Sequence, residues 1–374
     1  MSQSNHLNLV EQLTREVVER HAAKVDEEGR FPEESIAEFQ KSGLAGLLSA
    51  KEVGGMGQGP RAGVEVIERL ARACGSTAMV ATMHYSGAMV IEKYGDESTR
   101  RAIAEGKHLS TLAFSETGSR SAFWVPIGTA TKAGDKVKLN AKKSFVTSAS
   151  RATAYVWASK PLAAEGLSTL WLVPRDTAGL KVQGTFDGLG LRGNDSAPVT
   201  GADVTIPAAS MLGPDGGGFD IMLNVVLPFF NIFTGATAVG IMEAGTTATA
   251  GHAAATKFEY DGSRICDLPT VRNYIARMRC KTDSARTLLF DTVAAMETQR
   301  PDTVLRVLQS KANAGESATE VLDLGMRVCG GAAYRGDVGV ERMFRDARAG
   351  TVMAPTTDQL YDFIGKAVCG MDVF

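Results

Sequence analysis

The chain has 374 residues, of which 44% are hydrophobic, and a net charge of −2 at pH 7. A chain of this size can bury two or three packed units. It has no block of basic residues, so it lacks the electrostatic signature of a nucleic-acid-binding protein. Its five cysteines are scattered and form no C-x-x-C pair, which favours a reduced, cytoplasmic protein.

Two features of the sequence argue against export and against a membrane partner. The N-terminal segment is polar and then amphipathic, so we expect no signal peptide. The most apolar run, residues 225–233, is about half as long as the ~18 residues that a membrane span requires. Pro228 also interrupts this run.

The first 110 residues predict a helical domain. Leu9, Leu13 and Val17 recur at helical spacing, and a second long helical pattern covers residues 62–95. The glycine-rich segment 54–60 lies between these regions. No strand precedes it, so it predicts a connecting loop and not a phosphate-binding loop.

From Thr111 to about residue 214 the chain changes to short β-rich runs separated by glycine, aspartate, proline and serine. Residues 136–147, 154–160 and 168–174 are three examples. Runs this short and this evenly spaced favour a β-barrel or a sandwich.

After residue 214 the sequence returns to long helical patterns, which predict a helical bundle. Helices, then a β block, then long helices indicate an α+β chain with segregated layers. We therefore expect an N-terminal helical domain (1–110), a middle β-barrel domain (111–214) and a C-terminal helical bundle (215–374).

The chain resembles the acyl-CoA dehydrogenase family of flavoproteins over essentially its whole length. The likeness rests on four stretches in the family's order. Residues 112–122 (LAFSETGSRSA) are similar to its Thr-Glu-Pro-x-x-Gly-Ser loop, and residues 136–150 are similar to its Leu-Asn-Gly-x-Lys-x-Trp-Ile-Thr strand. Residues 189–219 resemble the segment that leaves the β domain. Residues 328–357 resemble its Gly-Gly…Arg-Asp-Ala-Arg…Tyr-Glu-Gly-Thr segment.

The resemblance implies a fold and a cofactor. The fold is a helical domain, a β-barrel and a helical bundle, usually assembled as a homodimer or homotetramer. The cofactor is FAD, bound between domains and subunits. The positions that match the family's cofactor-binding residues are Ser115, Ser121, Phe145, Thr147, Gly330, Gly331 and Thr356.

Flavin chemistry explains why these residue types suit the role. The ring system needs a surface to stack on and hydrogen-bond donors at its edge. Phe145 matches the stacking aromatic residue and Thr147 the edge hydroxyl, although both also fit an ordinary alternating strand. Gly330 and Gly331 match the backbone that approaches a neighbouring subunit's FAD, and they also fit a helix C-terminus.

The sequence departs from the family pattern where the catalytic base stands. Removal of the α-proton of an acyl thioester requires a carboxylate over the α-carbon. Ala354 occupies the family's main base position, and Phe230 occupies the alternative one. Pro228 and Asn231 stand where the family contacts CoA. The loop 258–262 lacks the arginine that reaches a neighbour's FAD.

His84 is the candidate for a replacement base. It lies on the helix that, in the family fold, lines the acyl pocket, and an imidazole titrates near neutral pH. A histidine hydrogen-bonded inside a helical core is the alternative. The histidines show no metal-ligand spacing, so we expect no metal site.

Charged residues near the matched motifs favour structural roles. Glu116 is the acid of the flavin loop, and we expect it to hold that loop in shape. Arg342, Arg345, Asp346 and Arg348 are crowded into one short stretch, which predicts a structural ion-pair cluster.

Three functional hypotheses follow. The first is an FAD-dependent dehydrogenase-like enzyme that acts on an acyl thioester or another small molecule, with an unusual base or none. It would pass electrons to a partner such as an electron-transfer flavoprotein or a flavin reductase. The second is a flavin-dependent monooxygenase or oxidase on the same fold. The third is a half-site subunit that needs a partner chain.

Overall fold

The computed structural model describes residues 4–184 and 186–373. Six helices form the N-terminal part, as the α+β prediction requires. They are α1 (Ser4–Leu13), α2 (Glu19–Glu27), α3 (Glu33–Lys41), α4 (Pro60–Ala73), α5 (Gly75–Tyr94) and α6 (Glu97–Ala104). A π-helical turn (Thr14–Val18) joins α1 to α2, and short 3₁₀ turns lie at Leu44–Gly46 and Lys51–Val53. The segment 54–60 is a loop that leads into Pro60, the first residue of α4.

The middle part is a β domain, as expected. Its strands are β1 (Ser110–Ala113), β2 (Thr129–Ala133), β3 (Lys136–Val146), β4 (Ala154–Ser159), β5 (Thr169–Pro174), β6 (Leu180–Val182), β7 (Ala197–Pro207) and β8 (Met211–Leu212). They form two four-stranded sheets with the orders β1-β4-β5-β8 and β2-β3-β7-β6. The pairing of β1 with β4 is parallel, and the other strand pairs are antiparallel.

Both sheets bury side chains in one shared core. Trp157 of β4 and Trp171 of β5 are fully buried there, beside Val137 of β3 and Val199 of β7. Valine and tryptophan suit the pleated, half-buried surface of a strand. This core makes the β domain a rigid wall on which loops can be positioned.

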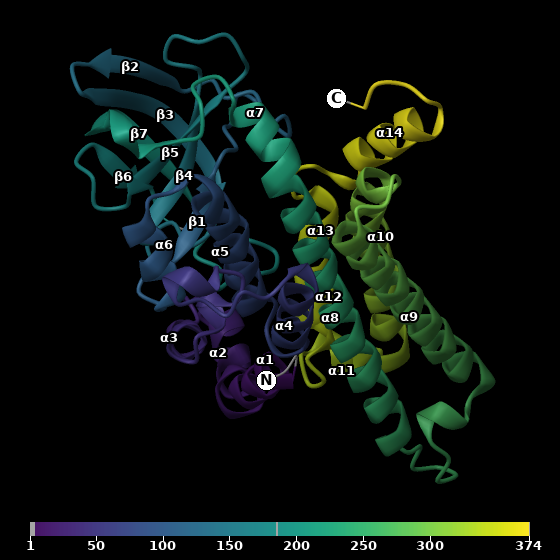
Figure 1. Ribbon diagram of the computed structural model, residues 1–374. Helices are drawn as coiled ribbons and strands as arrows, with labels where there is room; N and C mark the ends of the chain where they lie inside the picture. The colour runs from purple at the N-terminus through teal and green to yellow at the C-terminus, as the bar shows by residue number, and fades with distance from the viewer. Residues whose placement is uncertain (1–3, 185, 374) are drawn as a thin grey trace.

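The C-terminal part is a bundle of long helices with short elements at its end. They are α7 (Gly218–Ile221), α8 (Leu227–Ala255), α9 (Pro269–Thr298), α10 (Thr303–Cys329), α11 (Gly331–Tyr334), α12 (Val340–Ala347), α13 (Ala349–Val352) and α14 (Thr357–Val368), with a π-helical turn at Met222–Val226 and a 3₁₀ turn at Ile265–Asp267. In Figure 1, α8 runs diagonally between the rest of the chain and the α9–α10 pair.

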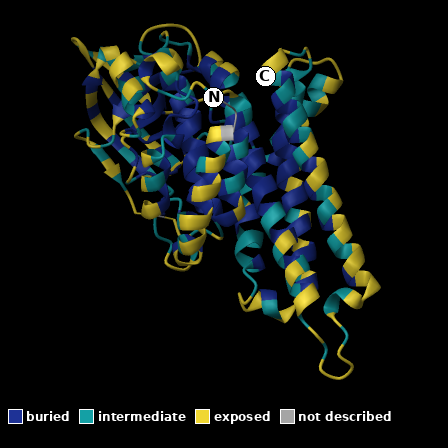
Figure 2. Cartoon of the chain, turned by 60° about the horizontal axis from the view of Figure 1, so that its bottom comes forward, coloured by how far each residue is buried: buried dark blue, intermediate teal, exposed yellow. Residues whose placement is uncertain are grey.

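Helix α8 is apolar on all sides because it is the core helix of this bundle. In the described part of the chain one helical stretch, Gly218–Ala255, has the length and apolar character of a membrane span. However, 89% of its most apolar window is buried inside the protein, which is typical of a core helix. In Figure 2 the buried residues concentrate where the bundle meets the rest of the chain.

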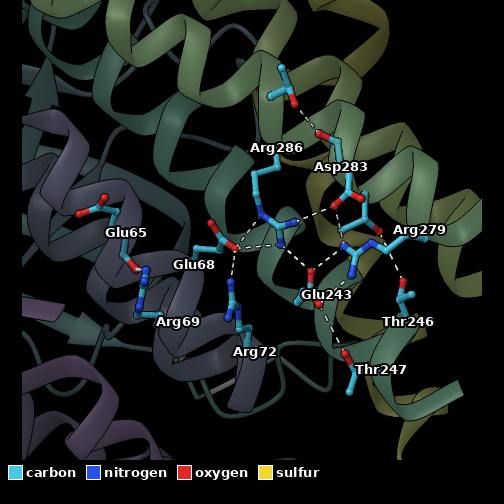
Figure 3. A network of polar contacts seen from close by, with 12 residues as sticks. Glu65, Glu68, Arg69, Arg72, Glu243, Thr246, Thr247, Arg279, Asp283 and Arg286 are labelled. Atoms are coloured by element: carbon cyan, nitrogen blue, oxygen red, sulfur yellow. Dashed lines mark hydrogen bonds and ion pairs between the residues drawn. The ribbon is translucent and has the colours of Figure 1, made fainter. Parts of the chain in front are cut away.

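A network of charged side chains joins the N-terminal helices to the bundle (Figure 3). Glu68 of α4 is buried and accepts hydrogen bonds from Arg72 and, at 3.1 Å, from Arg286 of α9. Glu243 of α8 accepts from Arg286 at 2.7 Å and from both terminal nitrogens of Arg279. Because Arg286 bridges both carboxylates, the network fixes α4, α8 and α9 against one another.

We predict that Glu243→Gln lowers the free energy of unfolding by about 1–3 kcal/mol, because two guanidinium groups lose a shared carboxylate. Hydrogen bonding from Arg279 lowers the pKa of Glu243 from 4.5 to about 2. Its ionised form therefore stabilises the fold above pH 4.5, and this contribution is lost as the pH falls towards 2. Denaturant unfolding at neutral and acid pH should show a difference between variant and wild type that shrinks on acidification.

The matched control is Glu320→Gln. Glu320 forms an ion pair with Lys281 at 2.6 Å, but its side chain is half exposed. An exposed pair contributes about 0–1 kcal/mol. Equal losses for the two variants would contradict a structural role for the Glu243 network.

Candidate active site

A cleft of about 1100 Å³ lies between the β domain and the C-terminal helices. Its walls come from the loop after β1, the end of β3, residues 186–196, the start of α8 and residues 345–356. Five predicted cofactor positions line it: Ser115, Ser121, Phe145, Thr147 and Thr356. Residues more than 200 positions apart in the chain therefore meet in one cavity, at the upper end of the size range of ligand sites.

Phe145 is presented to this cleft by an irregularity in β3. The register of β3 against β7 shifts between Lys143 and Val146, and Phe145 has a φ of 54°. Its side chain is 68% exposed and stacks on Phe186, with ring centroids 4.5 Å apart. A left-handed, exposed aromatic residue is costly, and such strain concentrates at functional sites. An ordinary alternating strand does not require it.

Three of the predicted cofactor positions offer a free hydroxyl group to a ligand. The side chains of Ser115, Ser121 and Thr147 line it and have no hydrogen-bond partner among the described residues. The backbone around them is well anchored. The carbonyl of Ser115 accepts from the Ser144 amide at 2.9 Å, and that of Thr147 accepts from Thr111 at 2.8 Å. Thr356 differs, because its hydroxyl caps α14 by accepting from the Gln359 amide.

A buried ion pair holds the loop that carries the serines. Lys143 of β3 donates to Glu116 at 2.7 Å and to the carbonyl of Ala158 at 2.6 Å. Glu116 also accepts from the amides of Ile127 and Gly128. Burial lowers the pKa of Lys143 to about 8. Glu116 thus holds the loop in shape, as expected, and leaves no free carboxylate there.

The two base positions of the family face the same cleft without an acid. Ala354 and Phe230 both line it. Among the described lining residues, the acidic one is Glu116, which is already paired with Lys143. The cleft therefore has no unpaired carboxylate in the described part of the chain.

The structure gives no support to a catalytic role for His84, because this residue lies outside the lining of the cleft. Its ring is fully buried. Nε2 is 2.9 Å from the Ala45 carbonyl, and Nδ1 accepts from the Ser110 amide at 3.1 Å. These partners fix the neutral tautomer with the proton on Nε2, and burial lowers the pKa of His84 to about 4. The geometry is that of a structural histidine that joins α5 to the 3₁₀ turn at Leu44–Gly46 and to the start of β1.

Gly330 and Gly331 also lie outside this cleft. Gly330 ends α10 with a φ of 54°, and both glycines are exposed. A Cβ at either position would meet nothing within 4 Å. Gly330 separates α10 from α11 with a positive φ that favours glycine, and Gly331 is the first residue of α11. Contact with a neighbouring subunit's cofactor stays a prediction.

The arginine-rich stretch is structural, but its contacts differ from the expected pairing within one helix. Arg345 binds Asp26 at the end of α2, with one contact at 2.9 Å. Asp346 is buried and accepts from the Leu191 amide at 2.6 Å, and burial raises its pKa to about 6. Arg342 donates to the Ala73 carbonyl. The stretch therefore clamps three separate segments.

The sequence motifs did not identify every residue that lines the cleft. Phe186, Arg120 and Arg348 line the cavity, and Arg348 stacks over Phe344 at 5.2 Å without an ion pair among the described residues. Phe186 lies outside the four matched stretches, so only the folded arrangement brings it to the site. Arg120 and Arg348 lie within matched stretches, but the motifs assigned no binding role to them. No cluster of metal-ligating side chains occurs among the described residues.

Family models match three parts of the chain. These are the N-terminal domain of acyl-CoA dehydrogenase at residues 2–106, its middle domain at 111–204 and its C-terminal domain at 216–369.

Among proteins of similar sequence, the probable acyl-CoA dehydrogenase FadE25 of Mycobacterium tuberculosis is 30% identical. That match covers 90% of this chain and 87% of the relative. The probable acyl-CoA dehydrogenase YngJ of Bacillus subtilis is 29% identical, with coverage of 91% and 90%.

Solved structures share the fold at lower identity. Butyryl-CoA dehydrogenase from Megasphaera elsdenii superimposes with a TM-score of 0.92 at 22% identity and covers 98% of both chains. The prolyl acyl carrier protein oxidase AnaB gives 0.86 at 21% identity, covering 96% of this chain and 98% of that one. Together with the domain matches, these findings show that the chain belongs to the acyl-CoA dehydrogenase family.

Proposed function

We propose that this protein is an FAD-dependent oxidoreductase that binds an acyl thioester in the cleft and acts on it without a carboxylate base from the chain. The proposal is supported by two features that occur in the same cavity. The predicted flavin-binding side chains converge there, and alanine and phenylalanine face the same space where the family has its base.

The residues present fit FAD, the cofactor of the family. Phe145 offers an exposed aromatic face, and Ser115, Thr147 and Ser121 offer hydroxyls without other partners. When bound, FAD supplies an acceptor for two electrons. Phe145 would stack on its ring, Ser115 and Thr147 would donate to the ring edge, and Ser121 would bind the pyrophosphate.

The remaining wall is suited to an acyl chain. Met83, Phe114, Phe123, Leu227 and Phe230 make much of the cleft lining apolar. Such a surface excludes water and binds a hydrocarbon group by burial. It provides no group that takes a proton from the α-carbon.

A flavin-dependent monooxygenase or oxidase is the second candidate. The absence of an unpaired carboxylate among the described lining residues favours the monooxygenase, because oxygenation does not begin with removal of an α-proton. AnaB, a structural neighbour, is described as an oxidase of a carrier-protein-bound substrate. The half-site hypothesis is weaker, since the flavin-facing side chains are retained.

We further propose a cytoplasmic homodimer or homotetramer that exchanges electrons with an electron-transfer flavoprotein or a flavin reductase. The family resemblance and the absence of cysteine pairing motifs support this proposal.

The first prediction concerns the cofactor. Phe145→Ala removes the stacking face and should raise the dissociation constant of FAD by about tenfold or more. Titration of the flavin-free protein with FAD, followed by flavin fluorescence, measures this constant. Tyr260→Ala is the control, because Tyr260 is exposed on a loop outside the cleft. A wild-type protein that stays colourless in excess FAD would remove the flavoenzyme proposal.

The second prediction concerns the missing base. In Ala354→Glu a carboxylate stands at the family's base position, and a positioned base contributes roughly 10²–10⁴-fold in rate. Anaerobic mixing of the FAD-bound variant with short and medium acyl-CoAs should bleach the visible flavin band faster than in the wild type. Ala354→Gln is the matched control, since it adds the same bulk without basicity.

Pro355 restricts the backbone of residue 354, so the same glutamate is also tested together with Pro355→Gly. If neither glutamate variant gains activity while FAD stays bound, the acyl-CoA substrate class is wrong. The monooxygenase or oxidase candidate then leads.

The third prediction concerns assembly. The purified protein should have the mass of two or four chains of 39.6 kDa in light scattering. A monomeric mass with tightly bound FAD would contradict a site completed by a neighbouring subunit.

A further inference from the structure

A buried lysine, Lys311 of α10, binds the segment that carries Ala354. Only 1% of its surface is exposed. Its Nζ donates to the carbonyl of Pro355 at 2.7 Å, to that of Met353 at 2.9 Å and, more weakly, to that of Gly350 at 3.4 Å. Lys311 forms no ion pair among the described residues. Its charge is therefore balanced by carbonyl dipoles alone.

A buried lysine without a carboxylate partner is costly, because its charge loses hydration. Burial accordingly lowers the pKa of Lys311 to about 7. By contrast, the other buried lysine at the site, Lys143, has Glu116 as its partner. A hydrophobic residue of similar length would fill the same space at Lys311 without this cost. What the lysine adds is the group of N–H donors on Nζ, which bind the backbone carbonyls of residues 350–355.

The donors act on both sides of the family's base position. The carbonyls of Met353 and Pro355 flank residue 354, so Nζ lies within about 6 Å of the Ala354 Cα by standard backbone dimensions. One turn further along α10, Gly315 lets the helix approach Gly350 closely. A Cβ on Gly315 would be 3.3 Å from the Gly350 backbone. Close helix packing and the lysine thus hold the segment together.

The segment held in this way forms a continuous wall of the cleft. Thr351, Val352, Met353, Ala354 and Thr356 all line the cavity. Between the end of α13 at Val352 and the start of α14 at Thr357, helical hydrogen bonds reach only the two ends of the stretch. The Met353 amide donates to the Ala349 carbonyl, and the Thr356 carbonyl accepts from the Leu360 amide. Its shape therefore depends on external partners, and Lys311 supplies two short, charge-assisted hydrogen bonds.

We propose that Lys311 is a positioning residue of the active-site cleft. It holds residues 350–355 so that the lining side chains from Thr351 to Ala354, and Thr356, face the bound cofactor and substrate. It sets the direction in which residue 354 points, whichever side chain stands there. This proposal rests on the proposed function only in naming FAD as the molecule that binds in the cleft.

The test is hydrogen–deuterium exchange of the full-length protein, with Lys311→Met, Lys311→Arg and the wild type compared. Methionine keeps the length of the side chain but removes every donor. Peptides covering residues 349–356 should exchange at least about tenfold faster in Lys311→Met, whereas the core of β4 and β5 keeps its protection. Arginine keeps donors and should restore part of the protection.

Lys281→Met is the matched control. Lys281 lies on α9 of the same bundle, pairs with Glu320 and does not line the cleft. It should leave exchange in 349–356 unchanged. Titration with FAD gives the second readout, in which Lys311→Met should raise the dissociation constant by about tenfold and Lys281→Met should not.

Unchanged exchange in residues 349–356 of a folded Lys311→Met protein would overturn the proposal. If the methionine variant fails to fold, the arginine variant carries the test, and loss of local protection there also overturns it. Failure of both variants to fold would make Lys311 a determinant of the whole fold, which contradicts a positioning role. A wild type that does not bind FAD removes the proposed function, and the exchange result still tests Lys311.

Discussion

The ion pair between Glu116 and Lys143 is the contact on which the flavin-facing half of the cleft depends. Both side chains are buried. A charge in such a place is stable only when each partner's remaining donors or acceptors are satisfied. Lys143 also donates to the Ala158 carbonyl, and Glu116 also accepts from the amides of Ile127 and Gly128. The pair therefore ties the serine-bearing loop to β3, two residues before Phe145.

The opposite half of the cleft is held in place by different interactions. There the wall is the end of α13 and the irregular backbone that follows it, residues 350–356, which Lys311 anchors to α10. The preceding helix, α12, is attached through Arg345 to Asp26. One wall thus belongs to a rigid β domain, and the other to a segment held by side chains from distant helices. This division places four of the predicted flavin-binding positions, Ser115, Ser121, Phe145 and Thr147, on the β-domain wall, whereas Ala354 and Thr356 share the opposite wall.

Sequence reasoning predicted the order of helices, sheets and helices because each region has its own periodicity. It also predicted five cleft residues, because those positions lie in local motifs. The sequence left the role of His84 open between a catalytic base and a histidine of the helical core, because its partners Ala45 and Ser110 are 39 and 26 residues away in sequence. Periodicity marks His84 as a helix residue but cannot show which backbone groups meet its ring.

The same limit applies to the features that give the site its shape. The left-handed conformation of Phe145 depends on a register shift between β3 and β7, and the role of Lys311 depends on contacts with residues about 40 positions later. Neither leaves a local sequence signal. A lysine within a helix is usually exposed on the surface. The burial of Lys311 follows only from the packing of α10 against residues 350–355.

We propose that no described side chain of this cleft takes a proton from the α-carbon of a bound thioester. The most direct measurement is the exchange of deuterium at the α-carbon of an acyl-CoA, followed by NMR in the presence of the FAD-bound wild-type protein. Saturation-transfer signals from the same sample establish that the thioester is bound. We expect exchange at the enzyme-free rate. Exchange that rises in proportion to protein concentration would reveal a base in the cleft and contradict this proposal.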